Sequence, residues 1–200
     1  MNELAKLFGS VERVKVMRLF LHSVDKSLST EMIADKTRCK VDLIKKELGL
    51  LCSIDFIIKH KSKMISFSSR GQSYKEVVAY KLNSEFRYTE KLRDLLFDFE
   101  NLDPKIVQER LRPVGKAKLI ITSGIFTGDD KSRLDILYVG EAIKKPIMEK
   151  VVKELESEIG KELQYVTMDT EEYKYRSKMF DTFLRDVHIS KHKVVLDKLK

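Results

Sequence analysis

Cysteine is scarce in this chain of 200 residues, and long apolar runs are absent. The two cysteines, Cys39 and Cys52, have no further Cys or His at ligand spacing, so we expect reduced thiols and neither a disulfide framework nor a zinc site. No apolar stretch approaches the ~20 residues that a membrane span needs. The first residues lack the basic and then apolar pattern of a secretion signal. We therefore expect a cytoplasmic protein without a membrane partner.

Groupings of catalytic residues are also absent from the sequence. The four histidines are scattered, and no Ser-His-Asp or Cys-His arrangement can be argued from their spacing. His188 and His192 stand four residues apart, as in a helical metal pair, but no third ligand suggests itself. We predict no metal and no cofactor.

Positive charge is what the chain has in excess, with a formal net charge of +8. Residues 1–90 hold 17 Lys or Arg against 11 Asp or Glu, whereas residues 91–200 hold 22 against 20. The segment 56–75 contains five cations and no acid: Lys59, Lys61, Lys63, Arg70 and Lys75. Such a cluster suits the phosphate backbone of a nucleic acid, although a solvated surface gives the same pattern.

The first eighty residues show helical spacing and then a change to alternation. Ser29 is a suitable N-cap for a helix over 30–36, and a polar break at 37–40 precedes a helix over 41–52. One apolar stripe runs along that second helix and consists of Val41, Ile44, Leu48 and Leu51. Lys45 and Lys46 lie outside the stripe. Two helices joined by a short turn, the second with a basic face, are typical of a helix-turn-helix. Strands over 63–68 and 76–82 would follow, joined by a turn at 69–73; residues 56–58 could instead begin the first strand.

This order of elements carries a resemblance to a known family. The segments 4–10, 13–21 and 80–83 resemble ArsR-like winged-helix transcriptional regulators. The resemblance spans about residues 3–83, and it implies a winged-helix domain over residues 1–83. It implies binding of double-stranded DNA, usually by a homodimer. The expected DNA contacts are Arg38, Lys40, Lys45, Lys46, Lys59, Lys61, Lys63, Arg70 and Lys75. Asp42 lies among the residues of the second helix that would contact DNA, and its negative charge would repel phosphate.

A helical connector over 84–112 is expected next. Its main helix, 87–100, would supply dimer contacts or simply pack against its own domain. From residue 113 the pattern becomes α/β, with a helix over 145–159, a further helix opening at 169–172, and four buried strands. Those strands are predicted at 119–121, 134–139, 163–168 and 194–196.

The segment 120–140 is similar to the signature of the small nucleotidyltransferases. That family has Gly-Ser, followed about ten residues later by Asp-x-Asp, whose two carboxylates hold the Mg²⁺ ions of phosphoryl transfer. Here the pair is reversed as Ser123 and Gly124, Arg133 stands where the first acid would be, and only Asp135 is kept. The resemblance implies a vestigial nucleotide loop in a domain over 113–200 that is no longer an enzyme.

The sequence therefore predicts an α+β protein: an N-terminal winged helix-turn-helix, a connecting helix and a C-terminal nucleotidyltransferase-like domain. The expected function is that of a DNA-binding regulator whose silent second domain is a ligand sensor or an interaction module, with the effector unknown. Two alternatives stay open. One is a Mg²⁺-dependent nucleotidyltransferase, and the other is an antitoxin-like protein-interaction module.

Overall fold

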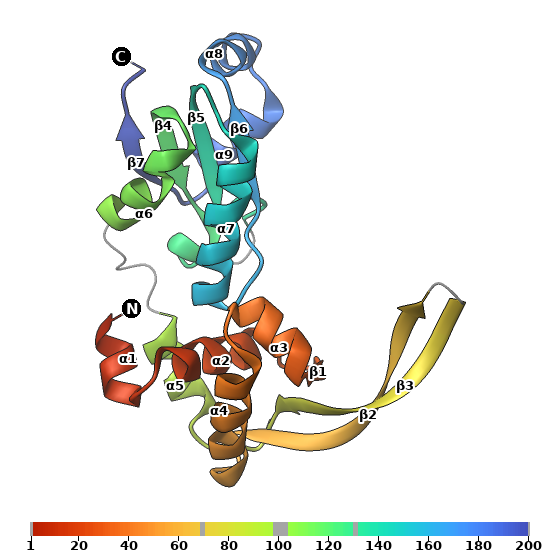
Figure 1. The fold of residues 1–200 in the computed structure, drawn as a ribbon. Helices are drawn as coiled ribbons and strands as arrows, with labels where there is room; N and C mark the ends of the chain where they lie inside the picture. Colours follow the sequence, from red (N-terminus) through yellow and green to blue (C-terminus); the bar gives the residue numbers. More distant parts are fainter. Residues whose placement is uncertain (1, 69–70, 98–103, 130–131, 200) are drawn as a thin grey trace. The chain divides into compact units, whose positions relative to one another are not determined.

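The computed structural model describes residues 2–68, 71–97, 104–129 and 132–199 (Figure 1). The chain forms two compact units. Unit 1 contains residues 1–97 together with 155–161, and unit 2 contains residues 98–154 and 162–200. Both units combine helices with a sheet, which confirms the expected α+β class. In the described part of the chain, none of the helices combines the length and apolar character that crossing a bilayer requires.

Helices supply most of unit 1. Two of them begin at a serine whose hydroxyl accepts a hydrogen bond from the first turn: Ser10 accepts from the Arg13 amide and Ser29 from the Met32 amide. The Ser29 cap confirms the helix start that the sequence predicts. The helices of this unit are α1 (Asn2–Phe8), α2 (Val11–His22), α3 (Thr30–Thr37), α4 (Val41–Ser53) and α5 (Thr89–Leu96).

One apolar cluster holds these helices together. Phe20 of α2, Ile33 of α3 and Ile44 of α4 are fully buried within it, and Leu48 and Leu51 are at most 1% exposed. The predicted stripe on α4 is therefore correct for three of its four members. Val41 is 38% exposed, because it is the first residue of α4 and lies beyond the edge of the core.

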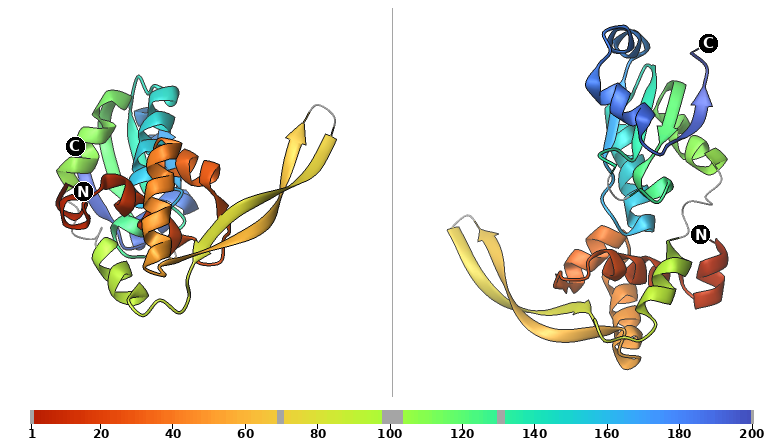
Figure 2. Two further views of the ribbon diagram at one scale, coloured as in Figure 1. Left: turned by 60° about the horizontal axis from the view of Figure 1, so that its bottom comes forward. Right: turned by 180° about the vertical axis from the view of Figure 1, so that it is seen from behind.

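A three-stranded sheet completes unit 1. The strands are β1 (Leu28–Ser29), β2 (Ile57–Ser68) and β3 (Gly71–Leu82), in the order β1-β3-β2 and paired antiparallel. The β2–β3 ladder runs without a break from the pair Ile57–Leu82 to the pair Ser68–Gly71. Within unit 1 the hairpin extends away from α2, α3 and α4 (Figures 1 and 2).

The hairpin is longer than the sequence predicts. β2 begins at Ile57, as the alternative start allows, and residues 71–73 of the predicted turn belong to β3. The reason is that ladder hydrogen bonds come from the main chain, so the ladder continues through Ser and Gly residues that give little strand signal in the sequence. The predicted connecting helix is shorter than expected, since α5 spans Thr89–Leu96; residues 98–100 lie outside the described part.

Unit 2 is built on a four-stranded sheet. Its order is β6-β5-β4-β7, with β4 antiparallel to both neighbours and β5 parallel to β6. The strands are β4 (Lys116–Thr122), β5 (Ile136–Glu141), β6 (Tyr165–Met168) and β7 (Lys193–Asp197). The helices are α6 (Pro104–Leu111), η1 (Arg112–Val114), η2 (Gly124–Phe126), α7 (Lys145–Ile159), α8 (Thr170–Lys178) and α9 (Thr182–Ile189). The last residues of α7, 155–159, belong to unit 1.

Helices cover both faces of this sheet (Figure 1). One face of β4 and β5 packs with Leu184 and Val187 of α9, through Leu119, Ile121 and Leu137. Along β5, residues 136–140 are all buried, as expected of a strand covered on both sides. The bounds of α7 match the prediction, whereas α9 was not predicted as a separate helix. The expected connector is divided, because α5 belongs to unit 1 and α6 to unit 2.

Candidate nucleic-acid interface

Helix α4 presents a polar outward face. Ile44, Glu47 and Leu48 point into unit 1, so residues 42, 45, 46, 49 and 53 fall on the opposite side and are exposed. Lys45 and Lys46 are therefore displayed together, as the sequence predicts from their place off the apolar stripe. Asp42 lies one turn earlier, and its carboxylate stands 3.9 Å from the Lys45 ammonium. The face is weakly basic, with two cations against one acid.

The turn between α3 and α4 is tight. Arg38 has φ of 54°, in the left-handed region, and its amide closes the end of α3 on the carbonyls of Ala34 and Asp35. Lys40 follows as the N-cap residue of α4, with extended backbone. Both side chains are exposed. The turn thus adds two cations beside the outward face of α4.

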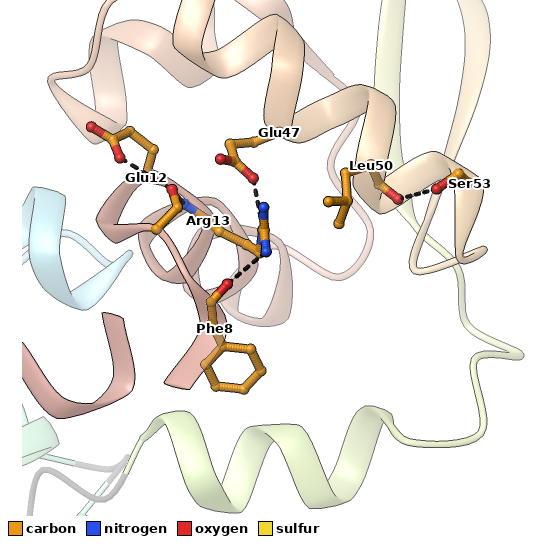
Figure 3. Close-up of polar contacts among 7 residues, drawn as sticks. Phe8, Glu12, Arg13, Glu47, Leu50 and Ser53 are labelled. Carbon is orange, nitrogen blue, oxygen red and sulfur yellow. Dashed lines mark hydrogen bonds and ion pairs between the residues drawn. The ribbon is translucent and has the colours of Figure 1, made fainter. Parts of the chain in front are cut away.

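A buried ion pair fixes α4 against the other helices (Figure 3). The Arg13 Nε atom of α2 lies 2.7 Å from the Glu47 Oε2 atom of α4, and the Glu47 side chain is only 7% exposed. The same guanidinium donates from NH1 to the Phe8 carbonyl at the end of α1, at 2.6 Å. One arginine therefore connects α1, α2 and α4, and the direction in which Lys45 and Lys46 point depends on it.

The near half of the hairpin carries a row of lysines. Lys59, Lys61 and Lys63 alternate along β2, so they share one face and repeat at about 7 Å. All three are exposed. Lys61 lies 3.5 Å from Glu76 of β3, which reduces the net charge of the row. The sequence signal for this row was the run of cations without an acid, but Glu76 follows directly after that run and faces it.

Two predicted contacts lie outside what the structure describes. Arg70 is not among the described residues, and nothing is described of the Lys75 side chain. The remaining candidates of unit 1 fall into three groups: the turn with Arg38 and Lys40, the outward face of α4 with Lys45 and Lys46, and β2 with Lys59, Lys61 and Lys63.

The predicted vestigial loop lies in unit 2, between β4 and β5. Ser123 is buried, and its hydroxyl donates to the Lys191 carbonyl at 2.8 Å. Asp135 is 5% exposed and directly precedes β5. Its Oδ1 accepts from the Ile125 amide at 3.0 Å, and its Oδ2 accepts from the Gln164 amide at 2.8 Å. Both carboxylate oxygens therefore accept hydrogen bonds from main-chain amides.

Gly124 is required beside this carboxylate. Its φ is +55°, and a Cβ atom there would collide with the Oδ1 atom of Asp135. Asp135 thus closes the loop over η2 and joins it to the segment before β6. The Asp135 carboxylate therefore stabilises this part of the fold.

Arg133 lines a small cavity of about 390 Å³ beside this loop. Ser123, Ser132 and Asp186 are among the other residues around it. Across the described part of the chain, no three His, Cys, Asp or Glu residues are grouped closely enough to hold a metal ion.

Comparison of the chain with family models, curated proteins and solved structures returned no match.

Removal of the Glu47 carboxylate tests the ion pair in the helical core. We expect Glu47→Ala to lower the free energy of unfolding by about 2–4 kcal/mol, because the Arg13 guanidinium loses its partner in a mostly buried position. Glu47→Gln keeps an acceptor oxygen and should cost less. Chemical denaturation of the full chain measures both, with Lys46→Ala on the same helix as the control. Equal stability of Glu47→Ala and the control would contradict the role given to this pair.

Asp135 offers a second test of stability. Asp135→Ala leaves the Ile125 and Gln164 amides without their acceptor, so we expect a loss of about 2–4 kcal/mol in the free energy of unfolding. Asp186→Ala removes an exposed carboxylate from the same unit and should change stability by less than about 0.5 kcal/mol. Unfolding in urea compares the two. A stable Asp135→Ala protein would show that the carboxylate does not hold this loop.

Proposed function

We propose that the chain is a DNA-binding transcriptional regulator. In this proposal unit 1 is a winged helix-turn-helix that reads duplex DNA, and unit 2 is a catalytically silent relative of the nucleotidyltransferases that serves as a sensor or interaction module. The observation that carries the proposal is the placement of cations in unit 1. A helix with two outward lysines and a hairpin with a lysine row occur in one compact unit, in the order typical of winged helices.

Each element of unit 1 has a role in this proposal. Helix α4 enters the major groove, which is wide enough to admit one helix. Lys45 and Lys46 then contact phosphates or base edges, and Arg38 and Lys40 contact the backbone beside them. Asp42 disfavours any register that brings it close to a phosphate, so it restricts how α4 can lie in the groove.

The hairpin is the proposed wing. Alternating side chains on a strand place Lys59, Lys61 and Lys63 along one line, which suits the repeating phosphates of a nucleic-acid strand. The proposed DNA contacts also include Arg70 and Lys75. Because Glu76 lies 3.5 Å from Lys61 and directly opposite Lys63 in the ladder, we expect Lys59 to contribute more to binding than either of them does.

The chemistry of the loop in unit 2 supports a silent module. A two-metal site needs carboxylate oxygens that point at the ions. Both oxygens of Asp135 instead accept main-chain hydrogen bonds, and a guanidinium replaces the other acid at position 133. Incorporation of labelled nucleotide that depends on Mg²⁺ and is lost in a folded Asp135→Asn protein would contradict this part of the proposal.

Salt dependence tests DNA binding. Log affinity for a short duplex should fall linearly with log salt, with a slope of about −0.9 for each phosphate neutralised. The double variant Lys45→Ala with Lys46→Ala removes two cations, so the slope should become shallower by about 1.8. Fluorescence anisotropy measures the affinity of the full chain across a salt series. The matched control, Lys6→Ala with Lys26→Ala, removes two exposed cations elsewhere in unit 1 and should keep the original slope.

Two results would contradict DNA binding through α4. One is the absence of any binding to duplex at low salt. The other is an identical slope for the α4 variant and the original chain. Sequencing of duplexes selected from a random pool then identifies the operator.

A homodimer is part of the proposal. Leu50 on α4, Ile54 directly after α4 and Leu95 on α5 are 37–49% exposed and line one groove of about 900 Å³ in unit 1. A second copy would bury these side chains, and two copies would read half-sites one helical turn apart. We expect Leu95→Lys to shift the chain toward monomer and to weaken specific DNA binding. Sedimentation measures the mass, with Asp94→Ala, an exposed residue of α5 outside the groove, as the control; a Leu95→Lys protein of unchanged mass would contradict this surface.

A further inference from the structure

Unit 2 contains a second cavity that shares no residue with the vestigial loop. It measures about 730 Å³ and lies between α6, η1, the first half of β4 and the end of β7. Volumes of roughly 300–1,000 Å³ are those of small-molecule sites. The residues around it come from 105–120 and 196–198, so they meet only in the folded unit.

The charges around this cavity are strongly unbalanced. Five cations line it against one acid: Lys105, Arg112, Lys116, Lys118 and Lys198, with Glu109. Lys118 stands 3.8 Å from Glu141 outside the cavity. Arg112, Lys116 and Lys198 form no ion pair with the described residues. Arg112, Lys116 and Lys198 repel each other where they converge, and an anion placed among them removes that repulsion.

The floor of the cavity is apolar and is shaped by irregular strands. Ile120 and Leu196 line it together with Ala117. The pairing of β4 with β5 shifts between Ala117 and Leu119, which makes Lys118 the extra residue of a bulge. Bulges redirect side chains and are common beside functional sites. The Lys198 amide donates to the Lys118 carbonyl at 2.6 Å, so the two cationic segments are joined directly.

We propose that this cleft binds a small anion that carries two or more phosphoryl groups on a flat apolar or aromatic body. The cationic rim would hold the phosphoryl oxygens, with Arg112 able to donate two parallel hydrogen bonds. The apolar floor would take the body of the ligand. Because the side chains themselves neutralise the phosphates, binding requires no divalent metal. This site gives unit 2 a ligand class, and it does not depend on DNA binding by unit 1.

Calorimetry with the full chain tests the proposal. Adenosine triphosphate, inorganic triphosphate and adenosine are titrated separately in the presence of a chelator that removes divalent ions. We expect adenosine triphosphate to bind, inorganic triphosphate to bind more weakly, and adenosine to show no measurable binding. The pair Lys116→Ala with Lys198→Ala should weaken adenosine triphosphate binding by about tenfold or more. The pair Lys153→Ala with Lys178→Ala removes two exposed lysines of the described chain outside the cleft and should leave it unchanged.

Arg112→Ala provides an independent variant, in case the double variant does not fold. It should also weaken adenosine triphosphate binding, while its unfolding in urea stays like that of the original chain. The proposal is overturned if adenosine binds as tightly as its triphosphate, if none of the probes binds, or if the cleft variants bind as the control does. A single-stranded oligonucleotide that displaces adenosine triphosphate, and whose own binding falls in the same variants, would make the cleft a nucleic-acid surface and overturn the proposal too.

Discussion

One guanidinium determines how the N-terminal helices are arranged. Arg13 donates to a main-chain carbonyl at the end of α1 and to a buried carboxylate on α4, so three helices share a single polar junction inside an otherwise apolar cluster. A buried charge of this kind is costly unless its partners stay in place, which makes alternative packings of α4 unfavourable. The proposed recognition surface depends on this junction, because the outward face of α4 is simply the side that the junction and the apolar cluster leave to solvent.

A buried carboxylate, that of Asp135, also stabilises unit 2. The resemblance predicts a metal ligand at Asp135. In the structure the two oxygens of its carboxylate accept hydrogen bonds from the Ile125 amide, ten residues earlier, and from the Gln164 amide, 29 residues later. A carboxylate that binds a cation in one setting can therefore stabilise a loop in another, provided that amides replace the ion.

The sequence predicts the elements whose signals are local and misses those that depend on distant partners. Ser29 as a cap, the stripe from Ile44 to Leu51 and the whole of α7 follow from short-range spacing. The two-residue strand β1 and the full length of the hairpin do not, because ladder pairing depends on main chain that lies far away in sequence. The same limit applies to sites: Lys45 and Lys46 could be placed from helical periodicity, whereas Arg112 and Lys198 are 86 residues apart and meet only through the pairing of β4 with β7.

The lysine row on the hairpin also affects how the protein behaves in solution at high concentration. Among the described residues, β1 pairs with β3 at Ala79 and Tyr80, and no further strand pairs with the outer edges of β2 and β3. Open edges invite pairing with another chain, and closely spaced like charges oppose it. The lysines of β2 would thus protect the ribbon from aggregation whenever no ligand covers it, which gives these positions a reason to stay cationic that is independent of recognition.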